Sequence, residues 1–226
     1  SAGLGWVTLG WGASTATIET FLAGFAGASQ LQFVYAQTNG STSGSYLNVT
    51  SVEHLNIDAG GGSDIVVYRD GGTRYLGGAD NDRFIADWSG QATGLTFDLT
   101  ANAAASTTLA NGITVGGFEQ FWLKLGSGAD RVTAHSNDYV DAGGGNDVLI
   151  GSSLSGATLK GGAGNDTFLS INALSNSIDG GTDDDTAWIK LRDQSTSETY
   201  NVDTVGYYSA GLGWVTLGWG ASTATI

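Results

Sequence analysis

The stretch GGAGNDTF at residues 161–168 decides the fold of this chain. Two glycines, a small residue, a third glycine, an asparagine and an aspartate come in succession, and the apolar Phe168 stands two positions after the aspartate. Glycine adopts positive φ without steric cost, so this spacing predicts a tight turn whose aspartate leads into a strand.

The same kind of turn occurs six times. The loops occupy residues 59–64, 77–82, 125–130, 142–147, 161–166 and 180–185, and they end on Asp64, Asp82, Asp130, Asp147, Asp166 and Asp185. Successive aspartates are evenly spaced, except for one long interval between Asp82 and Asp130. The even step of about 18 residues holds two short strands and two turns, which is enough for one coil whose strands pair with those of the neighbouring coils.

Apolar residues frame each loop on both sides. Two positions after the aspartates stand Val66, Phe84, Val132, Leu149, Phe168 and Ala187, and two positions before the loops stand Ile57, Tyr75, Leu123, Val140, Leu159 and Ile178. We expect these side chains to face inward. The pattern predicts an all-β fold: a right-handed parallel β-solenoid of the β-roll or β-helix type, with coils of about 18 residues and the glycine-rich turns along one edge.

The long interval and the two ends of the chain follow another pattern. Glu19, Glu53 and Glu119 each stand in a short apolar segment before a small-residue turn, and the step from Glu53 to Asp64 equals the step from Glu119 to Asp130. An outward-facing strand position and a structural anchor are both open for these glutamates. Wider coils or hairpins at about 31–50 and 89–117 would absorb the extra length, and helix is not expected beyond one short turn over 101–109.

A much longer repeat is also present. Residues 1–18 recur unchanged as residues 209–226, at an offset of 208. We expect residues 1–208 to be one tandem unit and residues 209–226 to begin the next, with an engineered duplication as the alternative. The chain begins at Ser1 and contains no methionine, so we expect it to be a piece of a longer protein whose solenoid continues from unit to unit.

Composition excludes several classes of partner. The 226 residues carry 22 acidic and 8 basic side chains, a net charge of −14, which disfavours nucleic acid and anionic membranes and favours cations. Cysteine is absent, which excludes disulfides and thiolate metal sites. No apolar run is long enough to suggest membrane insertion.

The loops resemble the calcium-binding nonapeptide repeats of the RTX family, G-G-x-G-x-D followed by an apolar residue, over residues 57–190. The resemblance implies Ca²⁺ ions between neighbouring loops, held by the aspartates and by oxygens of the glycine region. Asp80 and Asp183 stand at the fourth position of their loops, where the motif has glycine. Aspartate is tolerated at this position because it adopts left-handed backbone better than most residues. The candidate metal-site residues are Asp64, Asp82, Asp130, Asp147, Asp166, Asp185, Gly60, Gly62, Gly77, Asp80, Gly126, Gly128, Gly143, Gly145, Gly161, Gly162, Gly164, Gly180, Gly181 and Asp183.

Consecutive loops set the expected number of ions. The pair Asp64 and Asp82 gives one interface, and the run from Asp130 to Asp185 gives three. We expect about four Ca²⁺ ions per unit, or five if Asp82 and Asp130 also meet.

The resemblance implies a structural role rather than turnover. Such a unit is similar to the repetitive stalk of a large secreted or cell-surface adhesin, filament or matrix protein, exported by a type I system. Its expected partners are adjacent copies of the unit and a cell-surface or matrix polysaccharide.

Catalytic residues are not expected. His54 and His135 stand alone, and no G-x-S-x-G turn is present. The alternatives are a calcium-dependent polysaccharide lyase or epimerase, with Lys124, Lys160, Lys190 or Arg131 as the basic residue, and an ice-binding or carbohydrate-binding solenoid. The aligned strand positions mix Thr, Arg, Val and Ile, which weakens the ice-binding alternative.

Overall fold

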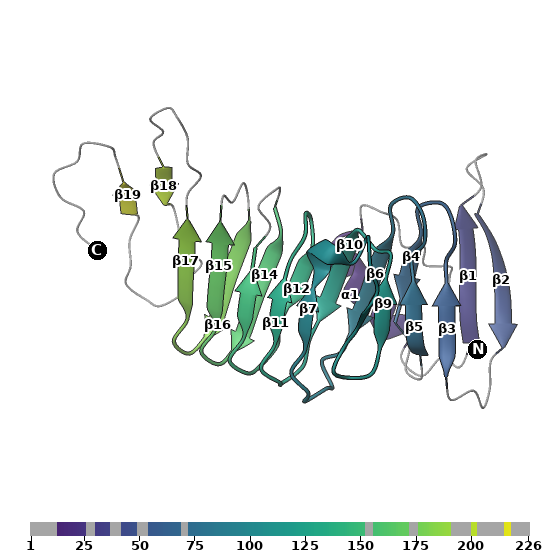
Figure 1. Ribbon diagram of the computed structural model, residues 1–226, viewed down its shortest axis with the longest axis horizontal. Coiled ribbons are helices and arrows are strands. Elements are labelled where there is room, and N and C mark those ends of the chain that lie inside the picture. The colour runs from purple at the N-terminus through teal and green to yellow at the C-terminus, as the bar shows by residue number, and fades with distance from the viewer. Residues whose placement is uncertain are drawn as a thin grey trace. The chain divides into compact units, whose positions relative to one another are not determined.

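The computed structural model describes residues 13–25, 30–36, 42–48, 54–68, 72–151, 156–171, 176–190, 200–202 and 215–217. The chain divides into two compact units, Ser1–Leu55 and Asn56–Ile226. Figure 1 shows the elements of both units.

The first unit contains one helix and one hairpin. Helix α1 (Thr15–Phe25) begins where the Ser14 hydroxyl accepts a hydrogen bond from the Thr17 amide at 3.2 Å. The expectation of no helix is therefore wrong at this point, and Glu19 lies on a helix rather than a strand. Strands β1 (Gln30–Ala36) and β2 (Thr42–Asn48) pair antiparallel, which confirms the hairpin expected at about 31–50.

The second unit is a parallel β-solenoid, as the loop spacing predicts. Its central sheet has six parallel strands in the order β16-β14-β12-β10-β6-β4. In chain order they are β4 (Ile65–Val67), β6 (Arg83–Asp87), β10 (Gln120–Lys124), β12 (Tyr139–Asp141), β14 (Thr158–Ala163) and β16 (Ser177–Thr182). Hydrogen-bonded neighbours on successive coils are 17 to 19 residues apart, except for 37 residues between β6 and β10.

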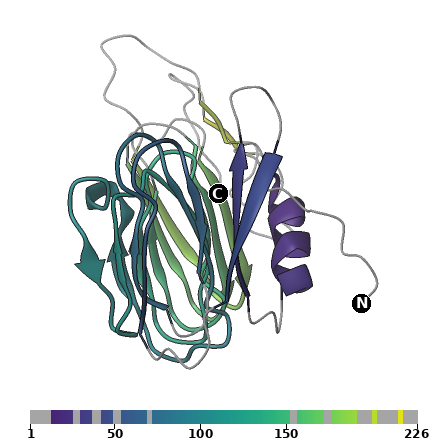
Figure 2. The ribbon, with the colours of Figure 1, turned by 90° about the vertical axis from the view of Figure 1, so that its right-hand side faces the viewer.

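Two smaller sheets form the opposite layer. One holds β7 (Thr96–Asp98), β11 (Arg131–Thr133), β13 (Val148–Ile150), β15 (Thr167–Ile171) and β17 (Thr186–Lys190). The other holds β3 (Leu55–Asp58), β5 (Gly72–Leu76), β9 (Thr114–Gly116) and β8 (Thr107–Thr108). Viewed along the stack in Figure 2, the coils are flattened, with the central sheet on one side and the smaller sheets on the other.

The 37-residue step is a single coil enlarged by an excursion. After β7 the chain passes through the 3₁₀ helix η1 (Leu99–Ala101) and the antiparallel pair β8 and β9 before it enters β10. This confirms the hairpin expected within 89–117. The excursion delays the return of the chain to the central sheet by about one coil length.

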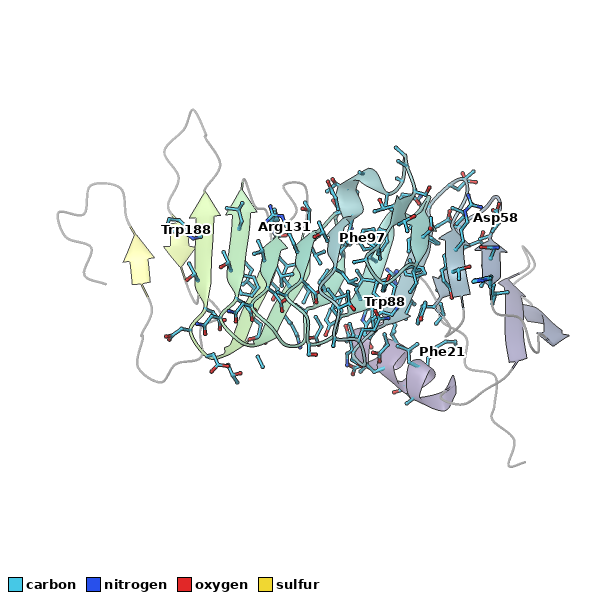
Figure 3. All side chains as sticks on the ribbon, turned by 60° about the horizontal axis from the view of Figure 1, so that its bottom comes forward. Phe21, Asp58, Trp88, Phe97, Arg131 and Trp188 are labelled. Carbon is cyan, nitrogen blue, oxygen red and sulfur yellow. The ribbon has the colours of Figure 1, made fainter. Side chains whose placement is uncertain are left out.

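One hydrophobic core fills the coil. All twelve framing residues predicted to face inward belong to it or pack against it. The ring of Tyr75 on β5 lies 5.3 Å from that of Phe84 on β6, and the ring of Phe97 on β7 lies 5.4 Å from that of Phe121 on β10. Both smaller sheets therefore pack on the same face of the central sheet, where Phe97 and the buried Trp88 also lie (Figure 3).

A short antiparallel pair, β18 (Tyr200–Val202) and β19 (Val215–Leu217), completes the described elements. Within the described part of the chain, no helix has the length and apolar character needed to cross a bilayer.

Candidate metal site

Strand pairing divides the six glycine-rich loops between two edges of the central sheet. Loops 59–64 and 77–82 lie immediately before β4 and β6, where the chain enters this sheet. The other four loops lie where the chain leaves the sheet: loops 125–130 and 142–147 follow β10 and β12, and loops 161–166 and 180–185 begin within the last residues of β14 and β16. All six strands are parallel, so the two groups of loops lie along opposite edges of the sheet, one where the strands begin and one where they end. We call them the first row and the second row.

The single edge expected from sequence is thereby corrected to two. The reason lies in the long interval between Asp82 and Asp130. It contains the enlarged coil of 37 residues, which ends at Glu119, and then the short segment from Glu119 to Asp130, which crosses the central sheet as β10. Asp82 and Asp130 therefore lie at opposite ends of adjacent strands, and the fifth ion interface expected between their loops does not form.

Five of the six loops share one backbone conformation. Their second and fourth residues have positive φ, as in Gly162 (φ 107°) and Gly164 (φ 116°). In two loops the fourth residue is an aspartate, Asp80 (φ 79°) or Asp183 (φ 82°), which confirms that aspartate occupies the left-handed region here. The remaining residues of this kind are Gly60, Gly62, Gly78, Gly143, Gly145 and Gly181.

The loops stack so closely that their backbones touch. A Cβ on Gly162 would collide with the Gly143 carbonyl oxygen, and a Cβ on Gly181 would collide with that of Gly162. The Gly143 oxygen accepts a hydrogen bond from the Ala163 amide at 2.9 Å, and the Gly60 oxygen accepts one at 2.8 Å from the next loop of the first row. Glycine is required here both for positive φ and for this close approach.

The aspartates form a ladder along each row. The Asp147 amide donates to Asp166 Oδ1 at 2.9 Å, and the Asp166 amide donates to Asp185 Oδ1 at 3.0 Å. The same bond joins the Asp130 amide to Asp147 at 2.7 Å and, in the first row, the Asp64 amide to Asp82 at 2.8 Å. Each carboxylate thus binds the backbone of the preceding coil through one oxygen.

The second carboxylate oxygen has no hydrogen bond in five of the six loop aspartates. Buried Oδ2 atoms without a partner occur at five loop aspartates: Asp64, Asp82, Asp130, Asp147 and Asp166. In loop 161–166 a Cβ on Gly161 would collide with Asp166 Oδ2, and in loop 180–185 the same holds for Gly180 and Asp185 Oδ2. In these two loops the Oδ2 atom therefore points into its own loop, against the first glycine.

Burial disfavours the charged form of these carboxylates. Desolvation raises the pKa of Asp147 to about 7, with further increases from Asp130 and Asp166, and it raises the pKa of Asp130 to about 6. Desolvation likewise raises the pKa of Asp64, Asp82 and Asp166. A bound cation would oppose these shifts because it favours the ionised carboxylate.

Loop 125–130 departs from the other five. Neither Gly126 nor Gly128 has positive φ. This loop stacks on the turn between β6 and β7: the Ser127 amide donates to the Gln91 carbonyl at 2.9 Å, and the Leu95 amide donates to Asp130 Oδ1 at 2.6 Å. Its neighbour on one side is therefore not a glycine-rich loop, although its aspartate still takes part in the ladder.

Two acidic residues at the first-row edge have roles that sequence alone left open or missed. Glu119 accepts a hydrogen bond from the Asp82 amide at 2.7 Å, so it is a structural anchor rather than an outward-facing residue. Asp138 is buried and accepts from the Phe121 amide at 2.8 Å and from the His135 amide at 2.6 Å. Burial raises the pKa of Asp138 to about 7. No glycine run precedes Asp138, so the loop motif could not reveal it.

The other candidate residues do not gather at one place. His54 is exposed, and His135 lies in the turn between β11 and β12. Lys124 and Lys160 each lie 5.9 Å from the ring of Trp122 or Tyr139, whereas the Lys190 side chain and Glu53 are outside the described residues. Trp188 on β17 is 66% exposed (Figure 3), and Trp6, Trp11, Trp214 and Trp219 are outside the described residues.

Side chains alone do not make a metal centre. In the described part of the chain, no three His, Cys, Asp or Glu side chains come together around one point. A hard cation between loops would therefore take most of its ligands from main-chain carbonyls, with one or two aspartates. The buried, unpaired Oδ2 atoms and the carbonyl-rich glycine turns are an oxygen-only donor set that fits Ca²⁺.

Comparison of the chain with family models, with curated proteins and with solved structures finds no match.

Proposed function

We propose that the chain is a calcium-stabilised structural repeat of a large secreted or cell-surface filament, adhesin or matrix protein. The observation that carries this proposal is the set of five buried aspartate Oδ2 atoms without a hydrogen bond, placed in register along the two rows. A buried carboxylate oxygen without a partner costs about 1–3 kcal/mol or more. Five repetitions of one such feature favour a ligand that binds at each of these five aspartates.

The partner that fits best is a divalent cation. A proton would satisfy a single carboxyl, but it would not use the carbonyl oxygens that the positive-φ turns bring close to one another. Calcium prefers six to eight oxygen ligands, and a carbonyl that already accepts one N–H retains a second lone pair. The net charge of −14 also opposes compaction until cations bind.

The stacking determines which loops would share ions. Loops 59–64 and 77–82 provide one interface of the common conformation, and loops 142–147, 161–166 and 180–185 provide two. The interface between loops 125–130 and 142–147 has one loop of a different conformation, so we expect it to bind more weakly. The proposed number from glycine-rich loops alone is therefore four, in two groups.

A mechanical role suits this arrangement. Each cation would join the aspartate of one coil to the next, so that binding stiffens the stack along its axis. Adjacent copies joined through the repeated segment 1–18 and 209–226, in which helix α1 begins at Thr15, would form a rod of linked solenoids. Contact with a surface or matrix polysaccharide, and export by a type I system, belong to the same proposal and rest on the loop resemblance.

A calcium titration tests the proposal. The purified chain should bind Ca²⁺ at or below millimolar concentration, and its thermal unfolding temperature should rise with calcium and fall again on chelation. Asp179→Asn, an exposed residue on the outer face of β16, is the matched control and should behave like the parent protein. Absence of binding at millimolar calcium would overturn the proposal.

The same preparation tests the expectation that the chain is not an enzyme. Release of unsaturated sugars from an acidic polysaccharide such as alginate or pectate would replace the structural proposal with the lyase alternative.

A further inference from the structure

The first row ends on a turn that lacks the glycine-rich motif. Residues 117–119, Gly-Phe-Glu, follow β9 and stack on loop 77–82. The Gly77 amide donates to the Gly116 carbonyl at 3.0 Å, and the Glu119 amide donates to the Asp82 carbonyl at 3.1 Å. The enlarged coil thus returns the chain to the first-row edge directly beside Asp82.

Glu119 takes the position that the next aspartate holds elsewhere in the ladder. Its Oε2 accepts from the Asp82 amide at 2.7 Å, within the range of 2.7 to 3.0 Å spanned by the ladder bonds between loop aspartates. The extra methylene of glutamate lets the carboxylate reach this amide from a turn that contains one glycine instead of two or three.

The main chain of the turn reproduces a further feature of the glycine-rich interfaces. A Cβ on Gly161 would collide with both Asp166 Oδ2 and the Gly180 carbonyl oxygen, so these two oxygens converge beside the first glycine of the loop. A Cβ on Gly77 would meet both Asp82 Oδ2 and the Gly117 carbonyl oxygen. Gly117 has φ 70°, the left-handed conformation that favours glycine.

The Asp82 carboxylate provides independent evidence that a ligand binds at this turn. Its side chain is fully buried, at 0% exposure, and its Oδ2 has no hydrogen bond. Three carboxylates, those of Asp64, Asp80 and Glu119, lie near enough to repel it. A cation would stabilise a buried, unpaired carboxylate oxygen in this environment.

We propose that Asp82, the Gly117 carbonyl and Glu119 form a further divalent-cation site at the end of the first row. This site rests on the proposed calcium-binding function, and it adds a fifth ion to the four expected from glycine-rich loops. It differs from them because one wall is a glutamate-bearing turn on the enlarged coil.

The test compares Glu119→Gln with the parent chain, with Ca²⁺ bound per chain measured by equilibrium dialysis. The substitution removes the negative charge but retains an oxygen that accepts from the Asp82 amide, so the coil should stay folded. The expected result is one ion fewer at saturation, and no loss for the control Asp179→Asn. Glu119→Asp, which keeps the charge but shortens the side chain, should weaken the binding of that one ion.

Asp166→Asn in the second row separates the two proposals. If Asp166→Asn reduces bound calcium and Glu119→Gln and Glu119→Asp leave it unchanged, the further site is wrong while the calcium function stands. If the parent chain binds no calcium, both are overturned.

Discussion

The two rows form the same kind of aspartate ladder, one at each of two opposite edges of the central sheet. In the first row, loops 59–64 and 77–82 precede their central strands and the ladder ends on Glu119; in the second row, four loops follow their central strands and the ladder begins at the Leu95 amide. A two-layer coil has two equivalent turning edges, so a glycine-rich loop can occupy either. What the rows share is an aspartate whose one oxygen holds the preceding coil and whose other oxygen lacks a hydrogen bond.

The enlarged coil between the rows explains why loop 125–130 differs. Loops 142–147, 161–166 and 180–185 each stack on a preceding glycine-rich loop, and all three have positive φ at their second and fourth residues. Loop 125–130 stacks on the turn after β6, where its close contacts are Gln91 and Gly94, and its glycines keep ordinary φ. The conformation of a glycine-rich loop therefore depends on its neighbour as well as on its own sequence.

Glycine substitutions should have the largest effect and should show that the rows are equivalent. Gly162→Ala and Gly78→Ala each place a Cβ at positive φ and against the carbonyl of the preceding loop, so each should destabilise the folded state by at least about 2 kcal/mol. Gly144→Ala, where a Cβ has no contact closer than 3.7 Å, should change stability by about 0.5 kcal/mol or less. Chemical denaturation measures all three. Equal effects of Gly144→Ala and Gly162→Ala would contradict the close stacking of the loop backbones.

Aspartate substitutions come next and should distinguish the rows by the number of ions lost. Asp166 lies between two interfaces of the second row, so Asp166→Ala should remove about two bound calcium ions. Asp64 belongs to one described interface, so Asp64→Ala should remove chiefly one. Calorimetric titration gives both numbers, and a loss of one ion in each variant would show that the ions do not sit between loops.

The pH dependence should separate the calcium-free and calcium-bound states. The folded-state pKa values of Asp130 and Asp147, about 6 and about 7, lie above the unfolded value of 3.8, so the folded protein binds protons more tightly than the unfolded chain. Without calcium, stability should therefore be greatest near pH 4 and should fall as the pH rises to about 7. Asp147→Asn should flatten this fall.

Saturating calcium should remove or reverse the pH trend, because the ions favour the ionised carboxylates. Thermal unfolding from pH 4 to 8, with and without chelator, provides the measurement. A calcium-free protein that gains stability as the pH rises through this range would contradict the assigned burial of the second row.

Substitution at the fourth loop position should have the smallest effect. Asp183→Gly relieves a positive φ but removes the Oδ2 that accepts from the Gly164 amide at 3.1 Å. These changes oppose one another, so we expect a change in calcium-free stability of less than about 1 kcal/mol. A loss of several kcal/mol would place Asp183 among the structural anchors of the row.

Loop spacing predicted the solenoid and its interior well, because period and framing residues are both local features. Residues such as Phe84 and Leu159 had to face inward once their loops were in register. The edge of the central sheet on which each loop lies was not predictable in this way, because it depends on how the excursion between Asp82 and Glu119 divides into strands. A half-coil offset was visible in the short step from Glu119 to Asp130, but strand pairing was needed to interpret it.

Helix α1 was missed for a different reason. Ile18, Phe21, Leu22 and Phe25 follow the spacing i, i+3, i+4 and i+7 of a helix face, but the segment is only 11 residues long. Its similarity to the Glu119 segment favoured a strand. The serine cap at Ser14 was the local signal that could have decided between the two.

The most direct test of the account is a crystal structure with calcium, in which anomalous scattering locates the ions. We predict peaks at both edges of the central sheet: beside Asp64, Asp82 and Glu119 at one edge, and between the loops that end on Asp147, Asp166 and Asp185 at the other. Peaks confined to one edge, or no peaks at the loop aspartates, would contradict the two-row calcium ladder.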